Sequence, residues 1–169
     1  MLVLGVDPGI AITGYGLVDE DDQGQLQPVA YGVIRTDPLL PQAQRLVSLF
    51  EQFNQLLLLH SPQCCAVEKL FFQKNVKTAT AVGEARGVII LALMQHALLP
   101  AEYTPNEIKQ AVCGYGSAGK AQVKQMVQVL LSLPSLPTPD DAADALATAI
   151  THHNHQRYQD AIERSSQES

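Results

Sequence analysis

The chain opens with Met1-Leu2-Val3-Leu4-Gly5-Val6-Asp7-Pro8-Gly9, and this stretch predicts the centre of an α/β fold. Residues 1–6 are apolar at almost every position, which is typical of a central strand covered by helices on both faces. The run then ends on Asp7. A carboxylate removed from water requires a cation, a metal or several hydrogen bonds, or else it is neutralised. For Asp7 alone, a turn role beside Pro8-Gly9 accounts for the residue equally well.

A second acid, Glu68, closes another apolar run, Cys64-Cys65-Ala66-Val67, after a break at Ser61-Pro62. This run also predicts a buried strand. If the two strands are neighbours, their terminal carboxylates face each other. Like charges at that separation are unfavourable unless a cation lies between them.

The segment 140–147 has the sequence Asp-Asp-Ala-Ala-Asp-Ala-Leu-Ala and predicts a helix. Thr138 is the expected N-cap and Pro139 the expected first helical residue. Asp140 fits a role in capping and in balancing the helix dipole.

Asp141 and Asp144 are three residues apart, so they project from one face of that helix. The alanines between them allow a close approach to a sheet, which would bring both acids to Asp7 and Glu68. Four oxygen ligands without cysteine or histidine favour Mg²⁺, with Mn²⁺ as a substitute, over zinc. In a site with two ions per subunit, one ion activates the attacking water and the other stabilises the leaving oxygen. The sequence therefore predicts a metal-dependent nuclease.

The remaining pattern predicts a single α/β domain over residues 1–155 and a polar, disordered tail over 156–169. Strands are expected at 13–19 and 26–36, joined by a polar turn as an antiparallel hairpin. A helix is expected from Pro41 to the Ser61-Pro62 break. The expected order is three strands, helix, strand, helix, strand, helices.

Several motifs together resemble the RuvC family of crossover junction endodeoxyribonucleases, whose fold is similar to ribonuclease H. They follow the family's order over residues 1 to about 150 and comprise Gly5-Val6-Asp7-Pro8-Gly9, Thr13-Gly14-Tyr15-Gly16, Glu68, Phe71, Lys74-Asn75, Tyr103-Thr104-Pro105-Asn106-Glu107-Ile108-Lys109, Gly114-Tyr115-Gly116, Lys120-Ala121-Gln122-Val123 and Asp141-Ala142-Ala143-Asp144-Ala145-Leu146. One departure is Lys69, where the family more often has glutamine.

The resemblance implies a ribonuclease H-like fold with a five-stranded mixed sheet, its first three strands antiparallel, flanked by helices. It implies that the metal-binding catalytic set is Asp7, Glu68, Asp141 and Asp144, with Lys120 as a further catalytic residue. It also implies a homodimer that hydrolyses two opposed strands of a four-way (Holliday) DNA junction in recombination and repair. The products would carry 5′-phosphate ends that a ligase can seal, and the RuvA–RuvB branch-migration complex would be a partner.

The expected DNA contacts follow from the same resemblance. Lys109 and Lys120 would contact phosphates near the scissile bond, where a lysine stabilises developing charge. Phe71 would stack on an unpaired base, although the residues alone leave core packing equally open and leave Phe72 undecided. The full expected set is Phe71, Lys74, Asn75, Lys77, Arg86, Lys109, Lys120 and Lys124.

The net charge of −6 and the pI near 5.2 are unusual for a protein expected to hold DNA phosphates. The charge is unevenly distributed, however. Residues 69–124 contain seven lysines and arginines against three acids, a net charge of +4, and the rest of the chain carries −10. A basic surface beside a metal-filled site can still bind a phosphate backbone. We expect weaker or more salt-sensitive binding than in more basic relatives.

Other features bear on the compartment and assembly. Three cysteines, and no basic start or long apolar span, predict a soluble cytoplasmic protein with structural thiols and no membrane contact. The helix after Asn75 is almost entirely apolar over 88–94, which requires cover on every side from the same chain or from a partner subunit. His152, His153 and His155 are expected at a solvated helix end.

Three other functions are compatible with parts of the sequence. The first strands also resemble the phosphate loop of actin-like and sugar-kinase ATPases, but these need a second domain that 169 residues do not supply. A non-catalytic junction-binding protein would need only the basic surface and Phe71, and four retained acids argue against it. A nuclease of the same fold acting on RNA–DNA hybrids differs in the substrate shape it accepts.

Overall fold

The structure is a computed structural model that describes residues 1–69 and 76–167. Its elements follow the predicted order of three strands, helix, strand, helix, strand and helices. The strands are β1 (Val3–Asp7), β2 (Ile12–Glu20), β3 (Leu26–Arg35), β4 (Cys64–Glu68) and β5 (Pro100–Tyr103), and the helices are α1 (Gln42–His60), α2 (Val76–Gln95), α3 (Pro105–Cys113), α4 (Lys120–Leu130) and α5 (Asp140–Gln167).

The five strands form one mixed sheet in the order β3-β2-β1-β4-β5. The first three strands are antiparallel, and β4 and β5 run parallel to β1. Strand β1 is therefore central, as its continuous apolar sequence predicts. The predicted five-stranded mixed sheet is confirmed.

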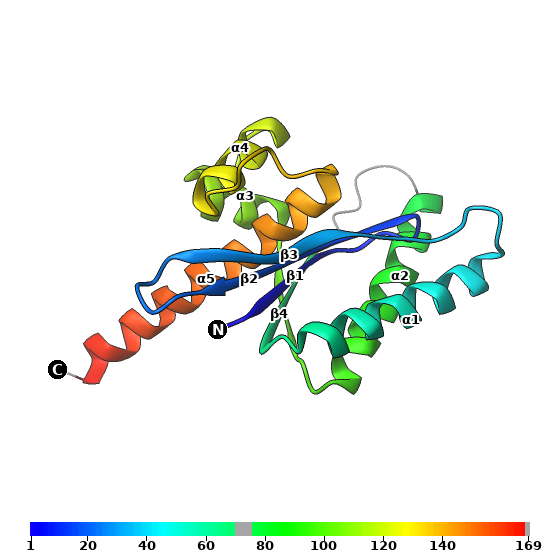
Figure 1. The fold of residues 1–169 in the computed structure, drawn as a ribbon, viewed down its shortest axis with the longest axis horizontal. Coiled ribbons are helices and arrows are strands. Elements are labelled where there is room, and N and C mark those ends of the chain that lie inside the picture. The colour runs from blue at the N-terminus through cyan, green and yellow to red at the C-terminus, as the bar shows by residue number, and fades with distance from the viewer. Residues whose placement is uncertain (70–75, 168–169) are drawn as a thin grey trace.

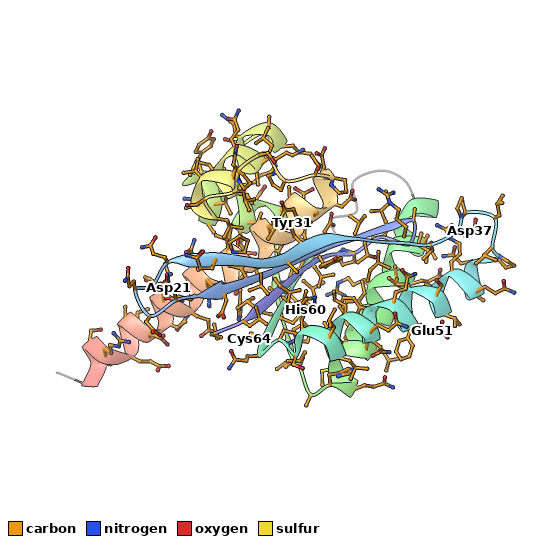
Figure 2. All side chains as sticks on the ribbon, in the orientation of Figure 1. Asp21, Tyr31, Asp37, Glu51, His60 and Cys64 are labelled. Atoms are coloured by element: carbon orange, nitrogen blue, oxygen red, sulfur yellow. The ribbon has the colours of Figure 1, made fainter. Side chains whose placement is uncertain are left out.

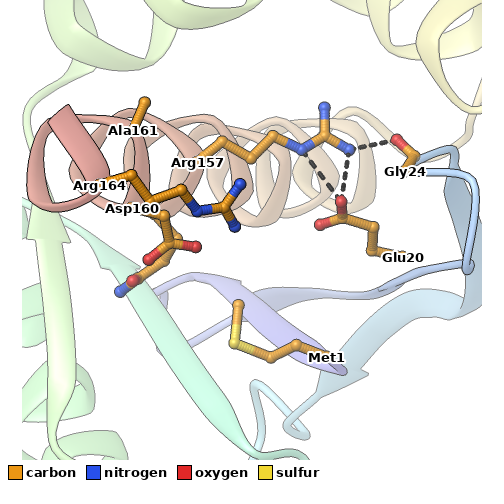
Figure 3. A pocket seen from close by; sticks show the side chains of 8 residues that line it. Met1, Glu20, Gly24, Arg157, Asp160, Ala161 and Arg164 are labelled. Atoms are coloured by element: carbon orange, nitrogen blue, oxygen red, sulfur yellow. Dashed lines mark hydrogen bonds and ion pairs between the residues drawn. The ribbon is translucent and has the colours of Figure 1, made fainter. Parts of the chain in front are cut away.

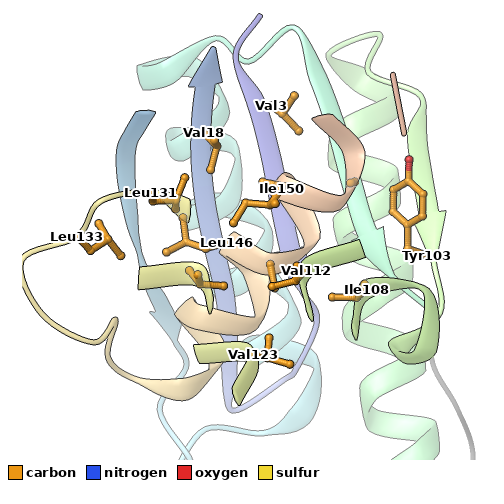
Figure 4. Close-up of a cluster of buried hydrophobic side chains, with 14 of the residues drawn as sticks. Val3, Val18, Tyr103, Ile108, Val112, Val123, Leu131, Leu133, Leu146 and Ile150 are labelled. Atoms are coloured by element: carbon orange, nitrogen blue, oxygen red, sulfur yellow. The ribbon is translucent and has the colours of Figure 1, made fainter. Parts of the chain in front are cut away.

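Helices cover both faces of the sheet, with α1 and α2 on one side and α3, α4 and α5 on the other (Figure 1). Alternate residues of β1 enter two separate cores, because successive strand side chains point to opposite faces. Leu4 and Val6 pack with α1 and α2. Val3 lies in the core that α5 forms with residues of α3 and α4, which Figure 4 shows. Polar side chains such as Asp21, Asp37 and Glu51 are exposed around this double core (Figure 2).

Helix α5 differs from the prediction at both ends. It begins at Asp140, and the Pro139 carbonyl accepts from the N–H groups of Ala142 and Ala143, so Pro139 takes the N-cap position predicted for Thr138. The segment expected as a disordered tail from residue 156 continues the helix to Gln167. Good helix formers and the ion pair of Arg157 with Glu20 account for this extension.

The histidines near the middle of α5 also differ from the prediction of a solvated helix end. His153 is fully buried and its Nε2 lies 3.0 Å from the carbonyl oxygen of Val18. His152 is buried with its Nδ1 2.9 Å from the Tyr103 hydroxyl. Only His155 of the three is exposed. Because the helix continues well beyond them, these histidines lie along its packed part and not at its end.

Helix α2 is covered on one side by this chain. Ile89, Ala92 and Leu93 are buried, whereas Leu91 is 54% exposed and Met94 49% exposed. A Cβ atom added to Gly83 or Gly87 would meet nothing within 4 Å. The expectation that every side of this helix is covered is therefore not met by the described part of the chain alone. No helix in the described residues combines the length and apolarity that a bilayer crossing requires.

Candidate active site

Two of the predicted acids lie side by side at the ends of adjoining strands. Asp7 is the last residue of β1 and Glu68 the last residue of β4. The parallel pairing of Val6 with Val67 brings the following residues, Asp7 and Glu68, to the same edge of the sheet. Val3 in β1 and Ala66 in β4 lie an even number of residues from Asp7 and Glu68, so they share a face of the sheet with them. Both belong to the core on the α5 side, so the two acids also point toward the face that α5 covers.

The other two acids come from the first turns of α5. This helix contacts the sheet backbone to backbone, because glycines face it. A Cβ atom on Gly5 would lie 2.0 Å from the carbonyl oxygen of Ala145, and a Cβ atom on Gly14 would lie 1.9 Å from the carbonyl oxygen of Asp141. Neither separation is possible for a residue with a side chain, so these glycines determine how closely Asp141 and Asp144 approach the strand ends.

Asp7, Glu68 and Asp144 line one cavity of about 310 Å³. Lys109 of α3 and Lys120 of α4 line it too, and Lys120 Nζ lies 3.4 Å from Asp144 Oδ2. The apolar part of the wall consists of Pro105, Ile108 and Val123. Asp141 does not line the cavity, although its charge acts on both Asp7 and Asp144. The structure therefore brings three predicted acids and two predicted lysines together and places the fourth acid beside them.

Burial and mutual repulsion raise the pKa values of the cavity's acids. For Asp7 the pKa rises to about 8, first because the group is buried and then because Glu68, Asp144 and Asp141 are near. Burial and Asp144 raise the pKa of Glu68. Burial also raises the pKa of Asp144, while Lys120 opposes the rise. Asp144 and Asp7 in turn raise the pKa of Lys120. The two cavity lysines, Lys109 and Lys120, lower the pKa of Glu68 but do not outweigh burial and repulsion there.

The donor set suits a hard divalent cation. Carboxylates from three different elements line the cavity, and no cysteine or histidine among the described residues does so. Among the residues that the structure describes, no three acid, histidine or cysteine side chains are already arranged around a single ion position. The acids repel one another and Asp144 contacts Lys120, and a bound cation would offset that repulsion. The chemistry of these residues fits a metal.

The predicted DNA-contact residues have different surroundings. Lys109 and Lys120 line the cavity. Lys124 forms an ion pair with Asp140 at 2.7 Å, and Arg86 forms one with Glu102. Lys77 lies in the first turn of α2, and the structure describes its backbone only. The predictions for Phe71, Phe72, Lys74 and Asn75 fall outside the described residues.

Sequence reasoning missed two groups of residues that shape this site. The apolar wall of Ile108 and Val123 is not distinguishable in sequence from ordinary core residues. The contact of Gly14 and Gly16 with α5 could have been predicted from the sequence. The two glycines are two residues apart in a strand, and the helix 140–147 is rich in alanine. Glycine at alternate positions leaves one strand face without side chains, so it predicts a backbone contact on that face.

A second cavity of about 620 Å³ lies at the other end of β1. It is bordered by Met1, Glu20, Gly24 and the last turns of α5. Arg157 bridges one side of it through hydrogen bonds to the Glu20 carboxylate and the Gly24 carbonyl oxygen (Figure 3). It lies apart from the four acids and contributes nothing to their site.

Comparison with known proteins gives consistent matches over most of the chain. The model of the family described as "Crossover junction endodeoxyribonuclease RuvC" matches residues 3–152. The RuvC of Brevibacillus brevis is 53% identical over 152 residues, which cover 90% of this chain and 91% of that protein. The RuvC of Pelotomaculum thermopropionicum is 50% identical over 155 residues, covering 92% and 94% respectively.

Two solved structures of Thermus thermophilus RuvC are similar to this one. The first has a TM-score of 0.87 and 34% identity, covering 94% of this chain and 97% of that chain. The second, in complex with a Holliday junction substrate, has a TM-score of 0.85 and 31% identity, covering 94% and 96%. A yeast mitochondrial Holliday junction resolvase, Ydc2, shares the fold with a TM-score of 0.72 at 12% identity.

A mixed sheet whose two adjoining central strands end in acids, with further acids on a helix across them, defines a ribonuclease H-like nuclease. Residues 3–152 match one family of that class throughout, at about half identity to several members. The chain belongs to the RuvC family of crossover junction endodeoxyribonucleases.

Proposed function

We propose that this protein resolves four-way DNA junctions by paired, metal-dependent nicks in opposed strands. The protein is an endonuclease of recombination and repair, as its family membership establishes. The observation that carries the proposal of a working catalytic site is the cavity shared by Asp7, Glu68, Asp144, Lys109 and Lys120. A purely junction-binding protein would have no use for buried acids that repel one another and repel phosphate.

We assign the metal site to Asp7, Glu68, Asp141 and Asp144, with two Mg²⁺ ions per subunit that Mn²⁺ can replace. The raised pKa values of Asp7, Glu68 and Asp144 support the assignment, because the nearby lysines do not supply enough positive charge to offset their burial and repulsion. Bound cations of this type activate a water for in-line attack on the phosphodiester and stabilise the leaving oxygen. The products carry 5′-phosphate ends.

Lys120 is the proposed catalytic lysine. Its side chain is 78% exposed while its Nζ lies 3.4 Å from Asp144 Oδ2, so it can reach both the acids and a phosphate at the cavity mouth. A lysine in that place stabilises the negative charge that develops on the scissile phosphate. Lys109 lines the same cavity and is proposed to hold the DNA backbone.

The wider DNA surface remains a prediction. It comprises Phe71, Lys74, Asn75, Lys77 and Arg86 in addition to the two cavity lysines, whereas Lys124, which the sequence also predicts for it, pairs with Asp140. Arg86 already has a carboxylate partner in Glu102, which makes its contribution to phosphate binding smaller than that of an unpaired arginine. Lys124 is considered separately below.

We further propose that the protein works as a homodimer through α2. The exposed stripe of Gly83, Gly87, Leu91 and Met94, here called the α2 face, is apolar and recurs at helical spacing. Its two glycines leave room for a partner helix to approach closely. Two subunits related by a twofold axis would present two sites to two strands of one junction.

Residues 1–155 are proposed as one nuclease domain that acts in the cytoplasm, with the RuvA–RuvB branch-migration complex as a partner. A synthetic four-way junction and a matched linear duplex, each with Mg²⁺ or with chelator, test the activity. We expect paired nicks in the junction alone, lost on chelation and in Asp7→Asn. Junction binding without cleavage across several sequences, with Mn²⁺ as well, would instead establish the non-catalytic function.

A further inference from the structure

Two ion pairs join α4 to α5 beside the active site. Lys120 pairs with Asp144 at 3.4 Å, and Lys124 pairs with Asp140 at 2.7 Å. The two lysines are one helical turn apart, and so are the two acids, so the helices run antiparallel where they meet. The four side chains, with Ala121 and Ala143, line one groove of about 250 Å³.

The Lys124–Asp140 pair has the features of a structural contact. The Lys124 side chain is only 19% exposed, compared with 78% for Lys120. Its ammonium group is therefore held against the protein by Asp140, which is itself 65% exposed, whereas that of Lys120 is open to solvent. A lysine whose charge is already neutralised at 2.7 Å has little to offer a phosphate.

The position of α4 depends on α5. Helix α4 packs mainly against α3 and α5, and not on the sheet. Its buried residues are Val123 and Val127, which lie on the helix next to the two lysines, and small β-branched side chains at helical spacing resist the sliding of one helix along another less than large ones do. Leu131 and Leu133 anchor the end of the helix in the core, and a polar contact of defined geometry would add a constraint at its beginning.

The equal spacing of the lysines and the acids supplies that contact. If α4 slipped by one turn along α5, Lys124 would face Asp144 or Lys120 would face Asp140, and one pair would be lost. Both pairs form together only in the observed register. We propose that Lys124, through its ion pair with Asp140, is a positioning residue that holds α4 in register on α5 and so keeps Lys120 beside Asp144.

This inference rests on the proposed function in one respect, namely that Lys120 acts on the scissile phosphate. The test compares Lys124→Gln, Asp140→Asn and the exchanged double variant Lys124→Asp/Asp140→Lys with the natural protein. Single-turnover cleavage of a junction at saturating protein measures the catalytic step. Junction affinity against salt, in chelator, measures DNA binding separately. Asp160→Asn, an equal charge change on the exposed end of α5, is the matched control.

We expect each single variant to cleave about tenfold more slowly, because a displaced catalytic group loses its orientation. The exchanged variant should recover to within about threefold of the natural rate, since the pair is restored with its charges reversed. Junction affinity and its salt dependence should not fall in any of them. Asp140→Asn is the decisive variant. It removes a negative charge near the DNA, which favours DNA binding, and yet we expect it to slow cleavage. The control should cleave at the natural rate.

A different pattern would overturn the inference. If Lys124→Gln weakens junction binding and lowers the salt slope by about one, while Asp140→Asn cleaves normally, Lys124 contacts a phosphate instead. Failure of the natural protein to cleave any junction would contradict the proposed function and not this inference. The position of Lys120 would then be followed by the ¹³C-methyl NMR signal of reductively methylated protein. That signal should shift in Lys124→Gln and return in the exchanged variant, and an unchanged signal would refute the positioning role.

Discussion

Gly14 and Asp141 are in backbone contact: a Cβ atom on Gly14 would lie 1.9 Å from the Asp141 carbonyl oxygen. Strand β2 therefore sets the height at which the first turn of α5 lies above the sheet. The same contact sets the distance from the helix acids to Asp7, because Asp7 is the β1 residue paired with Gly14. Three sheet residues thus control the site without contributing a functional side chain, namely Gly5, Gly14 and Gly16.

Replacing Gly14 by alanine should lift the start of α5 from the sheet. We expect a loss of about 2–3 kcal/mol in the free energy of unfolding, which is typical of overpacking, together with at least tenfold slower junction cleavage. Urea unfolding and single-turnover kinetics measure the two effects. Gly119→Ala is the control, since an added Cβ there meets only the end of the Gln122 side chain at 3.7 Å. Equal losses in both variants would contradict the proposed role of the contact.

Asp7 should make the metal-free protein less stable as the pH rises. Its pKa is about 8 when folded against an ordinary value of 3.8, so between these values the folded protein holds a proton that the unfolded chain has released. The contribution to stability is therefore present below pH 4 and is lost as the pH rises toward 8. At pH 8 in chelator, Asp7→Asn should be more stable than the natural protein by about 1–3 kcal/mol.

Added Mg²⁺ should make the natural protein more stable than Asp7→Asn, the reverse of the order in chelator. A cation bound by the folded state alone stabilises it by about 2.7 kcal/mol at a hundredfold excess over the dissociation constant. The natural protein should gain this stability and Asp7→Asn should not. Urea midpoints at pH 6 and pH 8, with metal and with chelator, measure both effects. If the urea midpoint of the natural protein changes neither with pH nor with added metal, the assignment of Asp7 as a metal ligand is wrong.

The α2 face should control assembly. Leu91→Glu places a charge in the apolar stripe, and we expect a monomer by sedimentation at concentrations where the natural protein is dimeric. On a plasmid bearing a cruciform, paired cleavage should give way to single nicks. Leu59→Glu on α1, where the side chain is 77% exposed, is the matched control and should stay dimeric. A dimeric Leu91→Glu protein would place the interface elsewhere.

Buried His153 should make the fold sensitive to acid. Burial lowers the pKa of His153 below its ordinary value of 6.5, so the unfolded chain takes up this proton first as the pH falls. The stability that the neutral ring provides is fully present above pH 6.5 and is lost below it. His153→Gln should be less stable than the natural protein at pH 7.5 by about 1–2 kcal/mol. That difference should shrink toward pH 5 in urea unfolding, and a constant difference would argue against this titration.

Much of the fold follows from the sequence because its signals are local. The apolar run ending at Asp7, the hairpin turn and the Ser61-Pro62 break each specify an element on their own, and the structure has all three. The closeness of Asp7 and Glu68 required only that the two strands be neighbours, which they are. The acids were recognisable because a carboxylate at the end of a buried apolar strand is costly to ionise without a cation beside it.

The rest depended on contacts between distant segments. His153 is buried because it meets Val18, 135 residues away, and nothing near it in sequence indicates this. Lys124 resembles any surface lysine until Asp140 is found beside it. The extension of α5 to Gln167 was missed because polar residues with good helix propensity are equally typical of a tail.

The acids of the site come from the beginning, the middle and the end of the chain, on β1, β4 and α5. No two of these elements can form the cavity without the third. While the protein is being made, the growing chain therefore lacks the cavity until α5 has emerged from the ribosome and docked. We therefore expect this nuclease to be inactive throughout its own synthesis, and a truncated copy that lacks α5 to be inactive for the same reason.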